Sequence, residues 1–240
     1  SEPGQSGQSL YAGEVRARVE SRLGFRVAGK LMQRAVDVGQ RVAAGQLLAA
    51  MDPQDYQLSA QAAQAQLLAA QTQRDVALAD YKRYESLRAQ GFISGAELER
   101  REASLKAAEA ALVQARSQSQ AQSNQVGYAR LQATAAGVVT ALEAEVGQVL
   151  AAGQPVLRLA HDGPRDAVFN VPEQSVQAFK VGMPMQAQLA GSSDSLKGLV
   201  REVGASADPV TRTFTVKLAL QASERLPLGA TVNVQVPGHV

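Results

Sequence analysis

The feature that most constrains this 240-residue chain is a short stretch that occurs twice, at residues 28–46 and again at 136–154. The two copies keep a constant offset of 108 positions, as from Gly29 to Gly137, without an insertion or deletion. Both contain Ala-Gly, Val-Gly-Gln and Ala-Ala-Gly-Gln. Branched residues followed by glycines predict a strand–turn–strand unit in each copy. Since such a unit is too small to be stable alone, we expect the two copies to bury their apolar faces against each other in one small β domain.

The stretch between the two copies has helical character. No proline lies between Pro53 and Pro155, and no glycine lies between Gly45 and Gly91. Alanine, glutamine, leucine, arginine and glutamate, which are strong helix formers, dominate this region. Pro53 fits the first turn of a helix, so the sequence predicts a first helix over about residues 53–89.

A second helix is predicted after a turn at residues 90–93. Ser94 and Glu97 have the spacing of a capping box, and the helix is expected to end near Gly127. Both helices carry a seven-residue repeat, which in the second falls on Leu98, Leu105, Leu112, Ser119 and Val126. Such narrow, alanine-rich stripes predict an antiparallel two-stranded coiled coil with arms roughly 50 Å long.

Alternating strand and turn signals follow from Val168 to the end of the chain. The predicted strands lie near residues 167–171, 185–189, 198–203, 214–220 and 231–236, with one short helix over 172–180. Several short strands with a single helix favour a small β-barrel.

Residues 27–52 resemble a known family. The pattern Val-Ala-Gly, then Val-Asp-Val-Gly-Gln and Ala-Ala-Gly-Gln-Leu-Leu-Ala-Ala-Met-Asp, is similar to the half-motif of a lipoyl (biotinyl-like) domain. This form is found in periplasmic adaptor proteins, also called membrane fusion proteins, of tripartite efflux pumps. The rival reading is a lipoyl or biotin carrier, but a carrier needs a lysine where this chain has Ala50, Met51 and Asp52.

The resemblance implies an α+β, elongated, multidomain fold with a split lipoyl domain, a long coiled-coil hairpin and a small β-barrel with one helix. The expected division is a flexible tail at 1–9, a strand of an incomplete membrane-proximal domain at 10–20, the barrel at 21–26 and 162–236, the lipoyl-like domain at 27–52 and 130–161, and the hairpin at 53–129. The strand at 10–20 is expected to lack its partners, because family members normally continue beyond the barrel.

Two sets of residues match the family's partner-binding positions. Arg83, Leu87 and Ser94 match the Arg-x3-Leu-x6-Ser signature that the family presents to an outer-membrane channel, although Ser94 also has a sufficient role as a helix cap. Asp208-Pro-x-Thr-Arg-Thr-Phe resembles a barrel segment of the family. Its Arg212 either pairs with a nearby carboxylate or faces the transporter.

We therefore expect an adaptor that links an inner-membrane transporter of the resistance-nodulation-division (RND) type to an outer-membrane channel, for export of drugs or other toxic compounds. The alternative is an adaptor for an ATP-driven exporter. The resemblance further implies self-association into a ring, and a periplasmic location attached to the inner membrane by an anchor outside this chain.

Composition and residue pattern argue against other classes of function. The chain has no cysteine, and its net charge of +2 comes from scattered lysines and arginines without an aromatic platform for nucleic acid. His161 and His239 have no second histidine or carboxylate at ligand or triad spacing. Met183 and Met185 are more typical of strand packing than of a soft-metal site. We expect no metal, no cofactor and no enzymatic activity.

Overall fold

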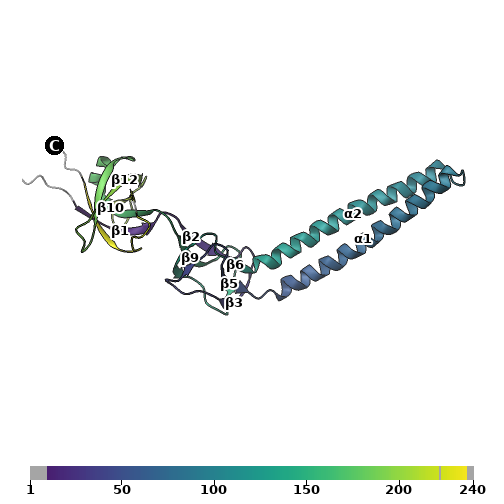
Figure 1. The fold of residues 1–240 in the computed structure, drawn as a ribbon, viewed down its shortest axis with the longest axis horizontal. Coiled ribbons are helices and arrows are strands. Elements are labelled where there is room, and N and C mark those ends of the chain that lie inside the picture. The colour runs from purple at the N-terminus through teal and green to yellow at the C-terminus, as the bar shows by residue number, and fades with distance from the viewer. Residues whose placement is uncertain (1–9, 222, 237–240) are drawn as a thin grey trace, which may run out of the picture.

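The structure, a computed structural model, describes residues 10–221 and 223–236. Figure 1 shows three parts along one long axis, with a β-barrel at one end, a β-sandwich in the middle and a pair of long helices at the other end. The predicted tail at residues 1–9 lies outside the described residues.

Two four-stranded sheets form the sandwich. One sheet has the order β2 (Glu20–Gly24), β9 (Pro155–His161), β7 (Gly137–Leu142) and β4 (Arg41–Val42). The other has the order β6 (Arg130–Gln132), β5 (Leu47–Met51), β3 (Gly29–Arg34) and β8 (Val149–Leu150). The offset of the sequence repeat maps β3, β4 and β5 onto β7, β8 and β9. Each sheet therefore contains strands from both copies, and neither copy forms a sheet by itself.

Hydrogen bonds between the two copies are reciprocal. The N–H of Gly39 donates to the carbonyl of Val139 at 2.7 Å. In the other direction, Gly147 donates to Leu31, also at 2.7 Å. Leu31 and Val139 are both fully buried in the core between the sheets. The prediction that two copies bury their apolar faces against each other is thus matched by the packing.

The repeated Gly-Gln pairs form four turns of the same design. The glycines at 39, 45, 147 and 153 all have positive φ, between 80° and 95°, which L side chains rarely adopt. The next residue locks each turn, because its side-chain amide oxygen accepts a hydrogen bond from the backbone N–H three residues earlier. These bonds measure 3.2, 3.0, 3.1 and 3.0 Å for Gln40, Gln46, Gln148 and Gln154. Turn geometry accounts for both residues of each pair.

Two long helices form the arm: α1 (Gln54–Ala89) and α2 (Gly95–Tyr128). They lie side by side and antiparallel (Figure 1). Their ends fall within about a residue of the prediction. Leu105 and Leu112 are buried in α2, as the seven-residue repeat predicts, whereas no residue of α1 is buried. The contact between the helices is therefore a thin seam.

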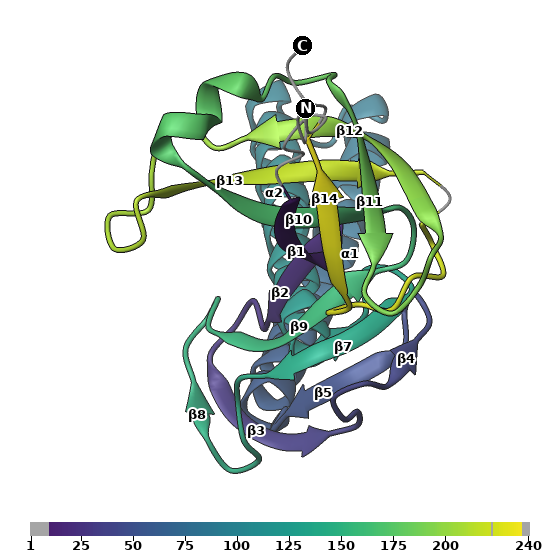
Figure 2. The same cartoon turned by 90° about the vertical axis from the view of Figure 1, so that its left-hand side faces the viewer.

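The third part is a closed barrel with strand order β1, β10, β13, β12, β11 and β14, which lies in front of the helices in Figure 2. Its strands are β1 (Leu10–Ala17), β10 (Arg165–Pro172), β11 (Pro184–Leu189), β12 (Ser195–Val203), β13 (Thr213–Leu220) and β14 (Thr231–Gln235). The single short helix is a 3-10 turn, η1 (Glu173–Ala178). Tyr11, Phe169 and Phe179 form an aromatic cluster in the barrel, with ring centroids 5.8–5.9 Å apart; Tyr11 stacks on Phe169, and Phe179 contacts both rings edge to face.

Two predictions about the N-terminal residues are wrong. Residues 10–20 are not a strand of a membrane-proximal domain, because β1 closes the barrel by pairing with β10 and β14 and buries Val15 completely. Residues 21–26 do not belong to the barrel, because β2 pairs with β9 in the sandwich, where Leu23 and Phe25 join the core.

An ion cluster lies where the chain passes between barrel and sandwich. The buried carboxylate of Asp166, on β10, accepts from Arg18 at 3.2 Å and from Arg201 at 2.6 Å. Arg18 belongs to the link between β1 and β2, whereas Arg201 lies on β12 of the barrel. The cluster fastens this link to the barrel.

Candidate functional site

The far end of the arm carries the predicted contact residues. Arg83 is 65% exposed and forms a salt bridge with Asp80, one turn earlier on α1. Leu87, one turn further on, is half-buried. Spacing by one helical turn places Arg83 and Leu87 on the same face of α1.

The connection between the helices is held by two side-chain hydrogen bonds and one glycine turn. Arg88 donates to the carbonyl of Ile93 at 3.1 Å, and Gly91 takes a positive φ of 80°. Ser94 caps α2, since its hydroxyl accepts from the N–H of Glu97 at 3.3 Å. The predicted capping role of Ser94 is thus present, and its hydroxyl group is also exposed at the tip.

Phe92 is a tip residue that the sequence reasoning missed. Its side chain is 72% exposed, although its backbone N–H is fixed by the carbonyl of Leu87 at 2.9 Å. Phe92 therefore presents an apolar surface at the end of the arm. The available signal was its place in a four-residue turn, where an aromatic side chain has no core to enter.

A polar network stiffens the arm behind the tip. The guanidinium group of Arg101, on α2, lies 4.3 Å from the ring centre of Tyr84, on α1, and 3.2 Å from Glu97. Nearby, a hydrogen bond with the Glu85 carboxylate raises the pKa of Tyr81 above its ordinary value. Of these contacts, the one between Arg101 and Tyr84 joins the two helices.

The predicted barrel residue, Arg212, lies in the loop between β12 and β13. Asp208 organises this loop by accepting from the N–H groups of Thr211 at 3.0 Å and Val210 at 2.8 Å, and these bonds lower the pKa of its carboxyl group. Arg212 has a φ of 56°, the one positive value outside glycine among the described residues. It is exposed and forms no salt bridge with the described residues.

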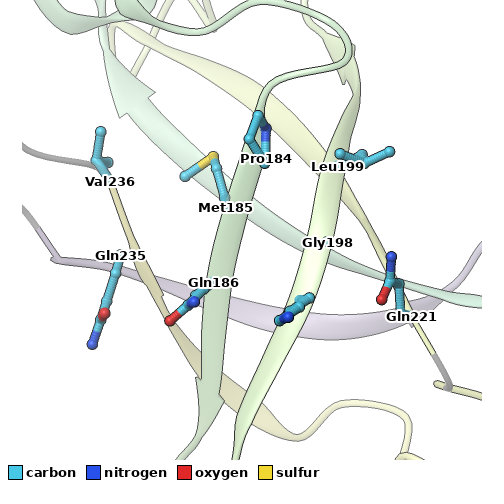
Figure 3. Close-up of a pocket in the computed structure, with 9 residues that line it drawn as sticks. Pro184, Met185, Gln186, Gly198, Leu199, Gln221, Gln235 and Val236 are labelled. Carbon is cyan, nitrogen blue, oxygen red and sulfur yellow. The ribbon is translucent and has the colours of Figure 1, made fainter.

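A recess of about 490 Å³ lies on the barrel between the ends of β11, β12 and β14. Figure 3 shows the side chains of Gln186, Gln221 and Gln235 around it. Met185 borders the recess but is buried in the barrel core, against which Met183 also packs. Both methionines therefore occupy packing positions, as expected from the strand pattern.

Among the described residues, the remaining candidates from the sequence do not form a reactive or metal-binding site. His161 shares a hydrogen bond of 2.8 Å with the hydroxyl of Ser21, which ties β9 to β2. The described residues contain no cluster of three or more histidine, cysteine or acidic side chains that could hold a metal ion. Within the same residues, no helix is long and apolar enough to cross a membrane.

The position that a carrier would need for its lysine is closed. Met51 is only 2% exposed, at the end of β5, and the chain continues through Asp52 directly into α1. There is thus no exposed hairpin turn at this point to present a cofactor.

Comparison with known families decides the classification. A family profile described as RND MFP, barrel-sandwich hybrid domain, matches residues 14–159. The chain belongs to the RND membrane fusion protein family. A second profile, described as CusB-like, beta-barrel domain, matches residues 167–239. The first match begins inside β1 and includes the sandwich and the helical arm, and the second starts within β10 of the barrel.

Curated relatives include multidrug resistance proteins. The chain is 33% identical over 165 residues to "Multidrug resistance protein MdtA" of Yersinia pseudotuberculosis serotype O:3, covering 68% of this chain and 36% of that protein. It is 32% identical over 156 residues to MdtA of Yersinia pestis, covering 64% and 35%. The chain therefore spans about 36% of the length of the first relatives that it matches.

Solved structures share the fold. The membrane fusion protein Spr0693 from Streptococcus pneumoniae gives a TM-score of 0.73 at 18% identity, covering 97% of this chain and 100% of that one. A MacA-MexA chimera containing the Pseudomonas aeruginosa MexA hairpin gives 0.68 at 20% identity, covering 97% and 81%. Membrane fusion proteins of low sequence identity thus share this arrangement of parts.

Proposed function

We propose that this chain is part of a periplasmic adaptor of a tripartite efflux pump, linking an inner-membrane RND transporter to an outer-membrane channel. The observation that carries the proposal is the arrangement of parts: a family-typical sandwich bears a helical arm on one side and a barrel on the other (Figure 1). A molecule with two such ends is suited to contact two partners at once. The exported compounds are drugs or other toxic molecules.

The tip of the arm is the proposed contact with the channel. Arg83 offers a charged group, Leu87 and Phe92 offer apolar surface, and Ser94 offers a hydroxyl at the turn. A cation beside apolar knobs on one helix end can dock into a groove between partner helices. Along the arm, α1 and α2 are proposed to pack as an antiparallel coiled coil, and several copies of the adaptor associate side by side into a ring.

The barrel is the proposed contact with the transporter, with the protein attached to the inner membrane on its periplasmic side. Arg212 supports this orientation, because it is exposed at a loop that Asp208 holds in one conformation. The RND profile favours an RND transporter over an ATP-driven exporter. A carrier function has no support, since Met51 is buried where the modified lysine would have to be exposed.

Cross-linking in cells tests the orientation. The chain contains no cysteine, so a cysteine introduced at Ser94 in the full-length protein gives one reactive tip position, provided that the remaining sequence is also cysteine-free. We expect capture of an outer-membrane channel from Ser94→Cys and of an inner-membrane transporter from Arg212→Cys. Capture of an inner-membrane protein from the tip would overturn the orientation, and capture of an ATP-driven exporter from the barrel would overturn the RND assignment.

Substitution at the tip tests the contact itself. Arg83→Asp combined with Leu87→Ser is expected to abolish drug export while leaving helicity unchanged. The matched control is Arg116→Asp combined with Leu68→Ser, which makes the same chemical changes at exposed positions elsewhere on the arm. Normal export by the tip variant, or equal loss in both variants, would exclude a specific role of the tip.

A further inference from the structure

One short segment of the sandwich contacts the roots of both helices. Residues 25–28 connect β2, in one sheet, to β3, in the other. The hydroxyl of Tyr56, in the first turn of α1, donates to the carbonyl of Ala28. At the other root, the guanidinium group of Arg26 lies 3.9 Å from the ring centre of Tyr128, the last residue of α2. Both contacts fall on the same four residues.

The covalent connections alone do not fix the direction of the arm. α1 follows β5 and α2 precedes β6, and these are neighbouring strands of one sheet. The N–H of Met51 donates to the carbonyl of Ala129 at 2.8 Å, which holds the two connections together. Two adjacent points of attachment still leave the arm free to rock about the line that joins them.

Segment 25–28 provides two contacts in addition to the covalent connections. It leads from β2 in one sheet to β3 in the sheet that contains β5 and β6, and Phe25 at its start is buried in the sandwich core, so the segment itself is anchored. The contact of Arg26 with Tyr128 therefore opposes rocking at the root of α2, and the hydrogen bond of Tyr56 with Ala28 opposes it at the root of α1. Both contacts are polar and lie at the surface, so they contribute little to global stability.

We propose that Tyr56, Tyr128 and Arg26 are positioning residues that brace the arm against the sandwich and set the direction of its tip. The length of the arm makes this important: a tilt of about 10° at the root moves the end of a 50 Å helix by roughly 9 Å. A displacement of that size exceeds the distance over which two side chains remain in contact. The proposal goes beyond the adaptor role, because it describes the chain alone and does not depend on any partner.

Distance measurement between two spin labels tests the brace. Leu68 on α1 and Val146 in the sandwich are exposed, and in a chain without cysteine Leu68→Cys and Val146→Cys can be labelled as a unique pair. In the labelled chain with Tyr56→Phe and Tyr128→Leu, we expect the distance distribution by double electron–electron resonance to become about twice as wide. Helical circular dichroism stays the same and the thermal midpoint falls by less than about 4 °C.

Three further variants separate a brace from a general packing role. Tyr128→Phe keeps an aromatic face for Arg26 and should keep the narrow distribution. Arg26→Met leaves both helices unaltered and should reproduce part of the widening. Tyr81→Phe removes a hydroxyl group from α1 far from the root and should have no effect. An unchanged width in the Tyr56/Tyr128 variant would overturn the proposal, and so would a widening that is matched by an equal loss of helical signal.

Discussion

Replacing Gly137 by alanine provides a sharp test of how closely two strands of the second copy, β7 and β9, pack in the sandwich. A Cβ atom at this position would lie 2.1 Å from the carbonyl oxygen of Ala160 and 3.0 Å from its carbonyl carbon. Both atoms belong to the backbone of β9, the strand that pairs with β7. Because no side chain can move aside, the two strands must separate locally.

The expected loss follows from these contacts. Overpacking a closely packed site costs about 1–3 kcal/mol, and a weakened backbone hydrogen bond adds about 1 kcal/mol. Gly137→Ala should therefore lower the free energy of unfolding by about 2–4 kcal/mol. The equivalent glycine of the first copy, Gly29, meets the thioether of Met51 instead, at 3.2 Å. Methionine is flexible, so Gly29→Ala should cost less than about 1.5 kcal/mol.

Urea unfolding followed by circular dichroism and fluorescence of an attached probe measures both variants. Neither glycine has a positive φ, so the comparison reports on space and not on backbone strain. Equal losses for the two variants, or a loss below about 1 kcal/mol for Gly137→Ala, would refute the steric reasoning.

Three other substitutions have defined outcomes. Leu112→Ala should lower the free energy of unfolding of the arm by about 2–4 kcal/mol, because the side chain is buried in the seam. Val113→Ala, at an exposed position, should change this free energy little. Ser94→Ala should cost about 1 kcal/mol in helix stability and Ser94→Asp should retain it, as calorimetry can measure. The hydrogen bonds from Thr211 and Val210 lower the pKa of Asp208. Its carboxylate therefore stabilises the folded loop above the unfolded pKa of about 3.9, and this contribution is lost as pH falls through the lower folded pKa. A titration by nuclear magnetic resonance that gives an ordinary pKa for Asp208, or Asp208→Asn leaving acid stability unchanged, would contradict this.

Local patterns in the sequence predicted the elements well. The absence of proline and glycine marked the extent of α1, and the capping spacing of Ser94 and Glu97 placed the start of α2. Turn glycines and branched residues identified the sandwich and barrel strands. These features are local, because they depend on residues a few positions apart.

Long-range pairing could not be predicted in the same way. Alternation in residues 10–17 indicates a strand, but it does not say which strands lie beside it, and the family resemblance assigned this strand to a membrane-proximal domain instead of the barrel. Likewise, β4 of the first copy pairs with β7 of the second, and β8 of the second copy pairs with β3 of the first. These pairings join residues more than 90 positions apart in the sequence. Single aromatic residues such as Tyr56 and Phe92 carry no periodic signal, so their contacts and exposure needed the structure.

The offset between the two copies also relates the arm to the barrel. The arm is inserted between β5 and β6, which pair with each other. The same offset carries β5 onto β9 and β2 onto β6, and β9 and β2 also pair with each other. The barrel is attached at these two strands, because β1 of the barrel leads into β2 and β9 leads into β10 of the barrel.

Arm and barrel are therefore attached at symmetry-equivalent corners of a pseudo-twofold body, and for that reason they project to opposite ends (Figure 1). Lengthening the arm or the barrel would move that end further from the sandwich without changing the direction of the other end. In the proposed adaptor, the separation of its two partners would thus be adjustable by helix length alone, while the internal symmetry of the sandwich keeps the two contacts facing away from each other.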